Sequence, residues 1–490
     1  MGNRRAAGGL WPNLLPLMAE RRGAELRSDR RPFKLRVGMT TYARRLGLFS
    51  ATMAVVGGII GGGIFRTPAA VAARVGSAEL VLGAWTIGGI IALIGALCYA
   101  ELGNRLPRAG GGYVYLREAW GALPAFMYGW ALLLVIATGA IAAVAVTFAD
   151  YALALTGLPA SLTAPVAVTA IVVLAGINYV GVTPGALTVN VLTVLKLLAL
   201  AVLVGAGLLL ALPPEQASVA APVPAPASPF IAMGAALVPI LFTFGGWQQT
   251  NFIAEEIVAP ERTLPRALVL GVLIVVAVYV LANLAYLRVL GLEGLARSAA
   301  PAADTMRALL GPAGGTFIAL GIAISTFGFL DLVILVTPRV LQAMAADGVF
   351  LPRLAVLHPR YRTPALAIVV EAVWAIVLTL SGSFAQLVDY VSFGDWIFFG
   401  LTVAGLTRLR ARDARREPEP GAVTGFRVPG YPWTPAIFVL ASALVVLSSI
   451  GANPRNAAIG TVLLLLGVPV YLWWRRPGAA GARARAGEPR

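Results

Sequence analysis

Charged residues are scarce in this chain. Only 12% of its 490 residues are charged and 59% are hydrophobic, whereas an ordinary soluble domain is about 25% charged. The single cysteine, Cys98, excludes a disulfide within the chain, and the single histidine, His358, leaves no Cys/His cluster with metal-ligand spacing. No nucleophile–base pair or nucleotide-binding loop is visible. We therefore expect no catalytic residue, no metal and no cofactor.

Apolar runs follow one another almost from end to end. A membrane-spanning helix needs about 20 mostly apolar residues, and runs of this length in lipid are helical because helices satisfy their own backbone hydrogen bonds. The sequence therefore predicts an all-α polytopic membrane protein with twelve transmembrane helices. Their predicted ranges are 47–75, 79–104, 123–151, 162–181, 185–212, 230–256, 266–290, 312–345, 364–382, 384–408, 433–450 and 456–474.

The net charge of +16 comes from arginines that lie in the tails and in short loops between apolar runs. The positive-inside bias places such loops, here those around Arg105, Arg353 and 408–416, in the cytoplasm. We therefore expect a multi-pass protein of the cell (inner) membrane with both termini in the cytoplasm. Its macromolecular surroundings are then the lipid bilayer, and nucleic acid is not an expected partner.

The first residues differ from the rest. They are rich in arginine and lack the apolar core of a cleaved signal peptide. We expect residues 1–41 to be a disordered extension, 42–476 to form the transmembrane domain, and 477–490 to be a disordered basic tail. We expect the native start to be Met39, with Met1 as the alternative.

Two of the predicted helices are interrupted by glycines near their middle. They read Gly57-Gly-Ile-Ile-Gly-Gly-Gly-Ile-Phe65 and Phe242-Thr-Phe-Gly-Gly-Trp-Gln-Gln249. Each opens a five-helix half, 47–212 or 230–408, and two further helices follow in 433–474. Glycine pairs also serve close helix packing, but three consecutive glycines favour unwinding. Broken helices at corresponding positions predict a transporter with inverted repeats.

A broken helix has a specific chemistry. The half-helix that begins near Gly62 would present free N–H groups and the positive end of its dipole to a carboxylate. The half-helices that end near Ile59 and Phe244 would present free carbonyls, which suit an ammonium group. Such a site recognises the backbone of an α-amino acid.

Four stretches carry a resemblance to a known family. They are Ile60-Gly-Gly-Gly-Ile-Phe65, Cys98 to Tyr113, Phe242 to Arg262 and Ser381 to Trp396. The chain resembles the amino acid–polyamine–organocation (APC) permeases, and within them the L-type amino acid transporter branch. The resemblance implies a transporter that works by alternating access, as an exchanger or a proton-coupled permease. No accessory subunit is indicated by the sequence.

The resemblance also implies a substrate site. The amides of Gly62 and Gly63 would bind the substrate carboxylate, although the family commonly has serine at position 62. Carbonyls of the two breaks would bind the amino group, and residues of the tenth helix would lie near the side chain. The implied substrate-binding residues are Ile59, Gly61, Gly62, Gly63, Ile64, Phe242, Gly245, Trp247, Gln248, Val391, Phe393 and Trp396.

Ionisable residues at bilayer depth are costly and indicate function. Lys196 is one of only two lysines and lies in the middle of the fifth predicted helix. In the resembling family such a lysine replaces a sodium ion, and Ser325 and Thr326 would be further ligands. Asp331 is a candidate proton site or a hydrogen-bonded carboxyl.

Several alternatives stay open. We expect sodium-independent transport of neutral L-amino acids. If Asp331 or Asp395 faced the side-chain pocket, a cationic amino acid or polyamine antiporter would be favoured. A membrane substrate sensor or scaffold without flux is the alternative from another class. Near the helix ends, Glu101, Glu255 and Glu256 are expected to form gate or loop ion pairs with Arg105 or Arg262.

Overall fold

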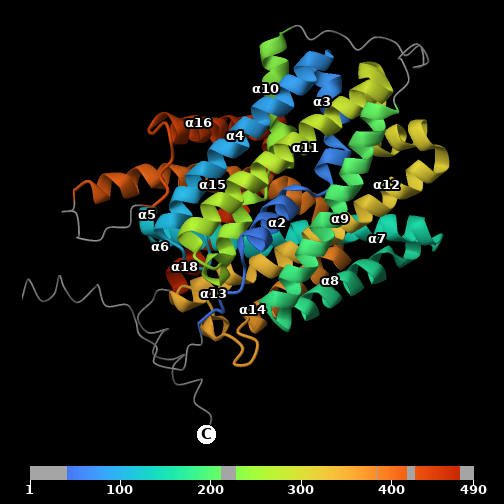
Figure 1. The fold of residues 1–490 in the computed structure, drawn as a ribbon. Coiled ribbons are helices and arrows are strands. Elements are labelled where there is room, and N and C mark those ends of the chain that lie inside the picture. Colours follow the sequence, from blue (N-terminus) through green and yellow to red (C-terminus); the bar gives the residue numbers. More distant parts are fainter. Residues whose placement is uncertain (1–40, 211–227, 383, 416–424, 475–490) are drawn as a thin grey trace, which may run out of the picture. The chain divides into compact units, whose positions relative to one another are not determined.

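The computed structural model describes residues 41–210, 228–382, 384–415 and 425–474 (Figure 1). Within α15 (Phe384–Asp413) the side chains of residues 384–393 are outside this description. In these ranges the regular secondary structure is helical and contains no strand, which confirms the predicted all-α class.

Nine helical segments of the described residues are long and apolar enough to cross a membrane. Two shorter apolar helices are α2 (Leu48–Ile59) and α14 (Ala365–Ser381). Each apolar range predicted from the sequence overlaps a helix, so the chain is a multi-pass membrane protein; the count of twelve spans and the repeat stay predictions. The nine are α4 (Ala78–Arg105), α6–η3–α7 (Ala122–Ala131, Leu132–Ile136, Ala137–Thr156), η4–α8 (Ala160–Leu162, Thr163–Tyr179), α9 (Val182–Leu209), α10–η6 (Pro229–Thr243, Trp247–Glu256), α11 (Pro260–Arg297), α12–α13 (Pro301–Val336, Pro338–Ala346), α16 (Trp433–Ala452) and α17–α18 (Pro454–Leu465, Gly467–Trp474).

Large apolar side chains point outward from these helices. Leu209 is 84% exposed and Phe230 88% exposed. In water such faces would be unfavourable, but in a bilayer the lipid tails are as apolar as the side chains. The exposed apolar residues therefore agree with the membrane assignment.

The structure adds helix where the sequence suggested loop. The short helix α5 (Gly112–Trp120) was not predicted. Helices α11 and α12 extend past their predicted ranges, through kinks at Gly291 (φ 67°) and Gly311 (φ 63°). These extensions are too polar for the apolar runs that defined the predicted spans.

Both glycine-interrupted segments are broken helices. The first helix, α2, ends at Ile59, and a single 3-10 turn, η2 (Gly63–Phe65), then leads into α3 (Thr67–Val75). The second, α10, ends at Thr243, and the chain continues from Gly246 as the 3-10 segment η6. The predicted positions of the two breaks are therefore confirmed.

The two breaks touch each other. A Cβ atom on Gly246 would lie 2.0 Å from the carbonyl oxygen of Gly58, and its φ of +108° disfavours other residues. Around this contact, α2 packs against α9, α11 and η6, and α11 lies beside α4 (Figure 1). Glycine is thus needed here for backbone-to-backbone contact as well as for the turn.

Candidate functional site

A cavity of about 520 Å³ lies between the two breaks. Its other walls come from η3, α7, α12 and α15. Most of its lining is apolar, with a few convergent polar groups, as is typical of small-molecule sites. Eight of the predicted substrate-binding residues line it, namely Ile59, Gly61, Gly62, Gly63, Phe242, Gly245, Gln248 and Trp396.

Four predicted residues are not in this lining. Ile64 is fully buried and its carbonyl accepts a hydrogen bond from the Tyr286 hydroxyl (3.4 Å). Trp247 is buried among aromatic rings, edge-on to Tyr99 with ring centroids 5.0 Å apart. Both are therefore packing residues in this structure. Val391 and Phe393 lie outside the residues whose side chains are described.

The amides of the first break are arranged as the sequence predicted. Among the described residues, the N–H groups of Gly62 and Gly63 have no hydrogen-bond acceptor, and both glycines line the cavity. A Cβ at Gly62 would meet nothing within 4 Å, so the space beside this amide is open. Free amides at the start of a helix can bind a carboxylate.

The carbonyls of the breaks differ from the prediction. Ile59 was expected to offer a free carbonyl, but its oxygen accepts from the Gly61 N–H (3.0 Å) and from the Tyr279 hydroxyl (3.1 Å). The Phe242 carbonyl accepts from the Gly245 N–H (3.0 Å). The prediction overlooked tertiary donors, because a carbonyl without a partner in its own helix can be satisfied by another helix.

Tyr279 is the residue that sequence reasoning missed. It is fully buried on α11, and its hydroxyl lies 3.1 Å from the Ile59 carbonyl and 3.4 Å from the Thr243 carbonyl. These are the last residues of α2 and α10, so one side chain bridges the ends of both broken helices. In the sequence, Tyr279 is marked only as a polar hydroxyl within an apolar run, which does not reveal its partners.

Lys196 is fully buried on α9 and reaches the first break. Its Nζ lies 2.7 Å from the Ile60 carbonyl oxygen, 3.1 Å from that of Ser325 and 3.4 Å from that of Gly57. An ammonium has three donors, and here each has a carbonyl acceptor. Lys196 thus contacts the first break, and its role as a substitute for a sodium ion stays a prediction.

The two hydroxyls predicted beside Lys196 have other partners. Ser325 contacts Nζ through its carbonyl, while its hydroxyl donates to the carbonyls of Ile60 and Gly61 (both 3.2 Å). The Thr326 hydroxyl bonds back to its own helix, at Ile322 (2.8 Å). A hydroxyl in a helix often bonds to the preceding turn, which explains the difference.

Of the two acidic residues that could have faced the pocket, Asp395 on α15 lines the cavity and Asp331 on α12 does not. Asp331 is fully buried, and its Oδ1 accepts from the Asn178 amide at 2.7 Å.

The acidic residues at the helix ends form ion pairs. Glu256 pairs with Arg339 (2.7 Å), and not with Arg262 as expected. Glu101 pairs with Arg105 (2.8 Å), as expected.

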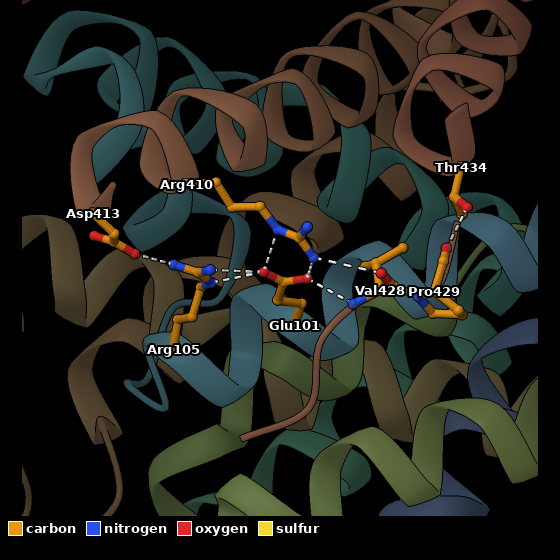
Figure 2. A network of polar contacts seen from close by, with 7 residues as sticks. All are labelled: Glu101, Arg105, Arg410, Asp413, Val428, Pro429 and Thr434. Carbon is orange, nitrogen blue, oxygen red and sulfur yellow. Dashed lines mark hydrogen bonds and ion pairs between the residues drawn. The ribbon is translucent and has the colours of Figure 1, made fainter. Parts of the chain in front are cut away.

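The Glu101 carboxylate is the centre of a larger network, which Figure 2 shows. It also accepts from the Arg410 guanidinium (2.8 Å) and from the backbone N–H of Val428 (2.7 Å). Arg105 continues the network to Asp413. These contacts join α4 to α15 and to the segment that precedes α16.

The third predicted span contains a π-helical turn, Leu132–Ile136. The Thr138 hydroxyl donates to the Leu133 carbonyl (2.7 Å) within it. Leu132, Val135 and Ile136 line the cavity. π-bulges occur frequently at functional sites, but hydropathy carries no signal for them.

The fold defines a multi-pass membrane protein with an internal cavity of the size of a small-molecule site. Residues 46–473 match the family model described as amino acid permease. The chain therefore belongs to the amino acid permease family of the APC superfamily, and it is a transporter, not an enzyme.

Similar proteins come from animals and bacteria. The chain is 31% identical to the human cystine/glutamate transporter over 445 residues, which are 89% of this chain and 86% of that protein. It is 32% identical to the human b(0,+)-type amino acid transporter 1 over 431 residues, 87% of each chain. It is 31% identical to the serine/threonine exchanger SteT of Bacillus subtilis (strain 168) over 448 residues, 89% of this chain and 98% of that protein.

Proposed function

We propose that this protein is a sodium-independent secondary transporter of L-amino acids that works by alternating access. The observation that carries the proposal is the pair of free amides at Gly62 and Gly63 in a cavity bounded by both broken helices. The substrate carboxylate binds these amides. Its amino group lies near the carbonyl ends of α2 and α10, where backbone dipoles are negative.

Lys196 takes the place of a sodium ion. The first break concentrates backbone carbonyls in a low-dielectric interior, which requires a positive charge nearby. The Lys196 ammonium supplies that charge from α9 and satisfies the carbonyls of Ile60 and Ser325. A tethered cation needs no refilling from solution, so transport proceeds without sodium.

The rest of the architecture is proposed on the same basis. The broken helices open the two five-helix halves, 47–212 and 230–408, of an inverted repeat. The protein lies in the cell (inner) membrane with both termini in the cytoplasm.

Asp331 is a proton site, because its Oδ2 lies buried without a hydrogen-bond partner among the described residues. Among the described residues no basic side chain pairs with it, and the Asn178 amide can bond to either protonation state of the carboxyl.

The substrate class has two candidates. Neutral L-amino acids were predicted from the sequence, and the mainly apolar lining of the cavity supports them. One observation favours cationic amino acids, namely the position of Asp395 in that lining. A polyamine lacks the carboxylate that the Gly62 and Gly63 amides would bind.

Uptake into proteoliposomes tests the proposal. The purified full chain is reconstituted, sodium is replaced by choline, and uptake of radiolabelled amino acids is measured with and without amino acid inside. Sodium-independent uptake that competes with unlabelled amino acids is expected. Binding without uptake, seen as ligand-induced thermal stabilisation alone, would instead favour a sensor or scaffold.

A further inference from the structure

An ionic side chain lies in the cavity wall. Among the described residues that line it, Asp395 is the only Asp, Glu, Lys or Arg. The glycine breaks contribute backbone groups, and the remaining walls are uncharged. Asp395 lies next to Trp396, which lines the cavity as well. Among the described residues, the charge of the cavity lining is therefore that of one carboxylate on α15.

The described residues place no cation beside this carboxylate. In the part of the chain that the structure describes, no hydrogen bond or ion pair reaches Asp395, which is partly exposed to the cavity. Two of the other buried carboxylates have cationic partners: Glu101 contacts Arg105 and Arg410, and Glu256 contacts Arg339. A charge taken out of water is costly unless it is paired. Among the described residues, the Asp395 carboxylate is thus an acceptor without a cationic partner.

The surroundings of Asp395 also suit a cation. Phe242 and Trp396 line the cavity with their rings edge-on and centroids 6.4 Å apart, and Phe399 lies beside Trp396 at 5.6 Å. Aromatic faces attract ammonium and guanidinium groups. Gln249, another lining residue, has a buried side-chain oxygen without a donor among the described residues. Carboxylate, rings and amide oxygen all favour a positively charged or donor-bearing group.

We infer that Asp395 is a specificity-determining residue that selects amino acids with a cationic side chain. The inference rests on the proposed function, because it takes the substrate carboxylate to bind at Gly62 and Gly63. The side chain then extends toward α15 and places its ammonium or guanidinium against Asp395. Asp331 plays no part in this selection, since it does not line the cavity.

L-lysine and L-norleucine form the sharpest probe pair, because they share a four-carbon side chain and differ by the terminal ammonium. Their affinities for the purified full chain are measured by ligand-induced thermal stabilisation, and by competition with uptake into sodium-free proteoliposomes. Lysine is expected to bind wild-type protein about tenfold tighter or more, which corresponds to about 1.4 kcal/mol.

The variant Asp395→Asn removes the charge and keeps the shape. It should weaken lysine binding by about tenfold and change norleucine binding by less than about twofold. The control is Asp150→Asn, which makes the same charge change at an exposed residue near the end of α7, where Asp150 accepts from Thr163 (3.0 Å). It should keep the wild-type ratio.

The wild-type ratio can refute the inference even if a variant fails to fold. Norleucine binding equal to or tighter than lysine overturns the role of Asp395 and leaves the amino acid transporter standing. An unchanged ratio in folded Asp395→Asn overturns it too. If no amino acid, cationic or neutral, binds or is transported, the proposed function fails together with it.

Discussion

Replacing Lys196 by methionine separates the charge of this residue from its volume. Methionine is about as long and fills similar space, but it has neither the charge nor the donors. The Nζ atom lies 2.7 Å from the Ile60 carbonyl, 3.1 Å from that of Ser325 and 3.4 Å from that of Gly57. Two contacts are therefore good hydrogen bonds and the third is at the limit of one.

The expected effect on stability is small. Hydrogen bonds to charged groups contribute about 1.5–3 kcal/mol each, so the two short ones contribute about 3–6 kcal/mol. Burying the ammonium costs several kcal/mol in the opposite direction, and apolar replacements of buried ions are often neutral. The Ile60 carbonyl also keeps the Ser325 hydroxyl as a donor, at 3.2 Å. We expect the free energy of unfolding of Lys196→Met to change by less than about 2 kcal/mol.

The expected effect on transport is large. Without the ammonium, the carbonyls of the first break lose the positive charge that the proposed function requires. Sodium-free uptake should fall by about tenfold or more, a barrier increase of at least about 1.4 kcal/mol. The control is Leu195→Met, because the Leu195 side chain is 40% exposed on the same helix and the substitution conserves volume.

The measurement is uptake in proteoliposomes with sodium replaced by choline, beside thermal unfolding of each purified variant. A folded Lys196→Met protein that transports at the wild-type rate would refute the reasoning. So would wild-type uptake that requires sodium. A variant that unfolds outright would contradict the estimate of offsetting energies.

Three further predictions concern other parts of the chain. In Gly63→Val, a Cβ would lie 2.7 Å from Thr243 Cγ2, so ligand-induced thermal stabilisation should disappear, and overpacking should lower the free energy of unfolding by about 1–3 kcal/mol. The control Gly205→Ala has nothing within 4 Å of its Cβ and should behave as wild type. Retained binding in Gly63→Val would place the carboxylate site elsewhere. Asp331→Asn removes the proposed proton site, so the pH dependence of uptake should flatten; an unchanged pH profile would leave this residue structural. Glu101→Gln removes the carboxylate that Arg105 and Arg410 share, and among the described residues Arg105 keeps only Asp413, so the free energy of unfolding should fall by about 3 kcal/mol. An unchanged thermal unfolding curve would show that the network in Figure 2 contributes little.

Two features of this protein were readable from the sequence. The spans were predictable because a bilayer requires long apolar helices, a constraint that acts on every window of the chain. The breaks at Ile59 and Thr243 were predictable because consecutive glycines weaken a helix locally. Both signals come from residues that are neighbours in the sequence, and α2 and α10 end within a residue of the predicted positions.

The partners of the broken helices could not be read in this way. Lys196 reaches a carbonyl 136 residues away, and Tyr279 one that is 220 residues away. No local pattern encodes such pairings, so the carbonyl of Ile59 was expected to be free when it was not. The Thr326 hydroxyl bonds to its own helix, and this was missed. The sequence does not show whether a serine or threonine hydroxyl bonds to its own helix or to another one.

The orientation of the acidic residues was decided by tertiary structure alone. In a soluble helix, the polar face marks the outside and the apolar face the core. In a membrane protein both faces of a helix are apolar, because one contacts lipid and the other the packed interior, so the pattern does not reveal which way a helix is turned. Only the packing of α12 and α15 against their neighbours placed Asp395 in the cavity wall and Asp331 behind it, against Asn178.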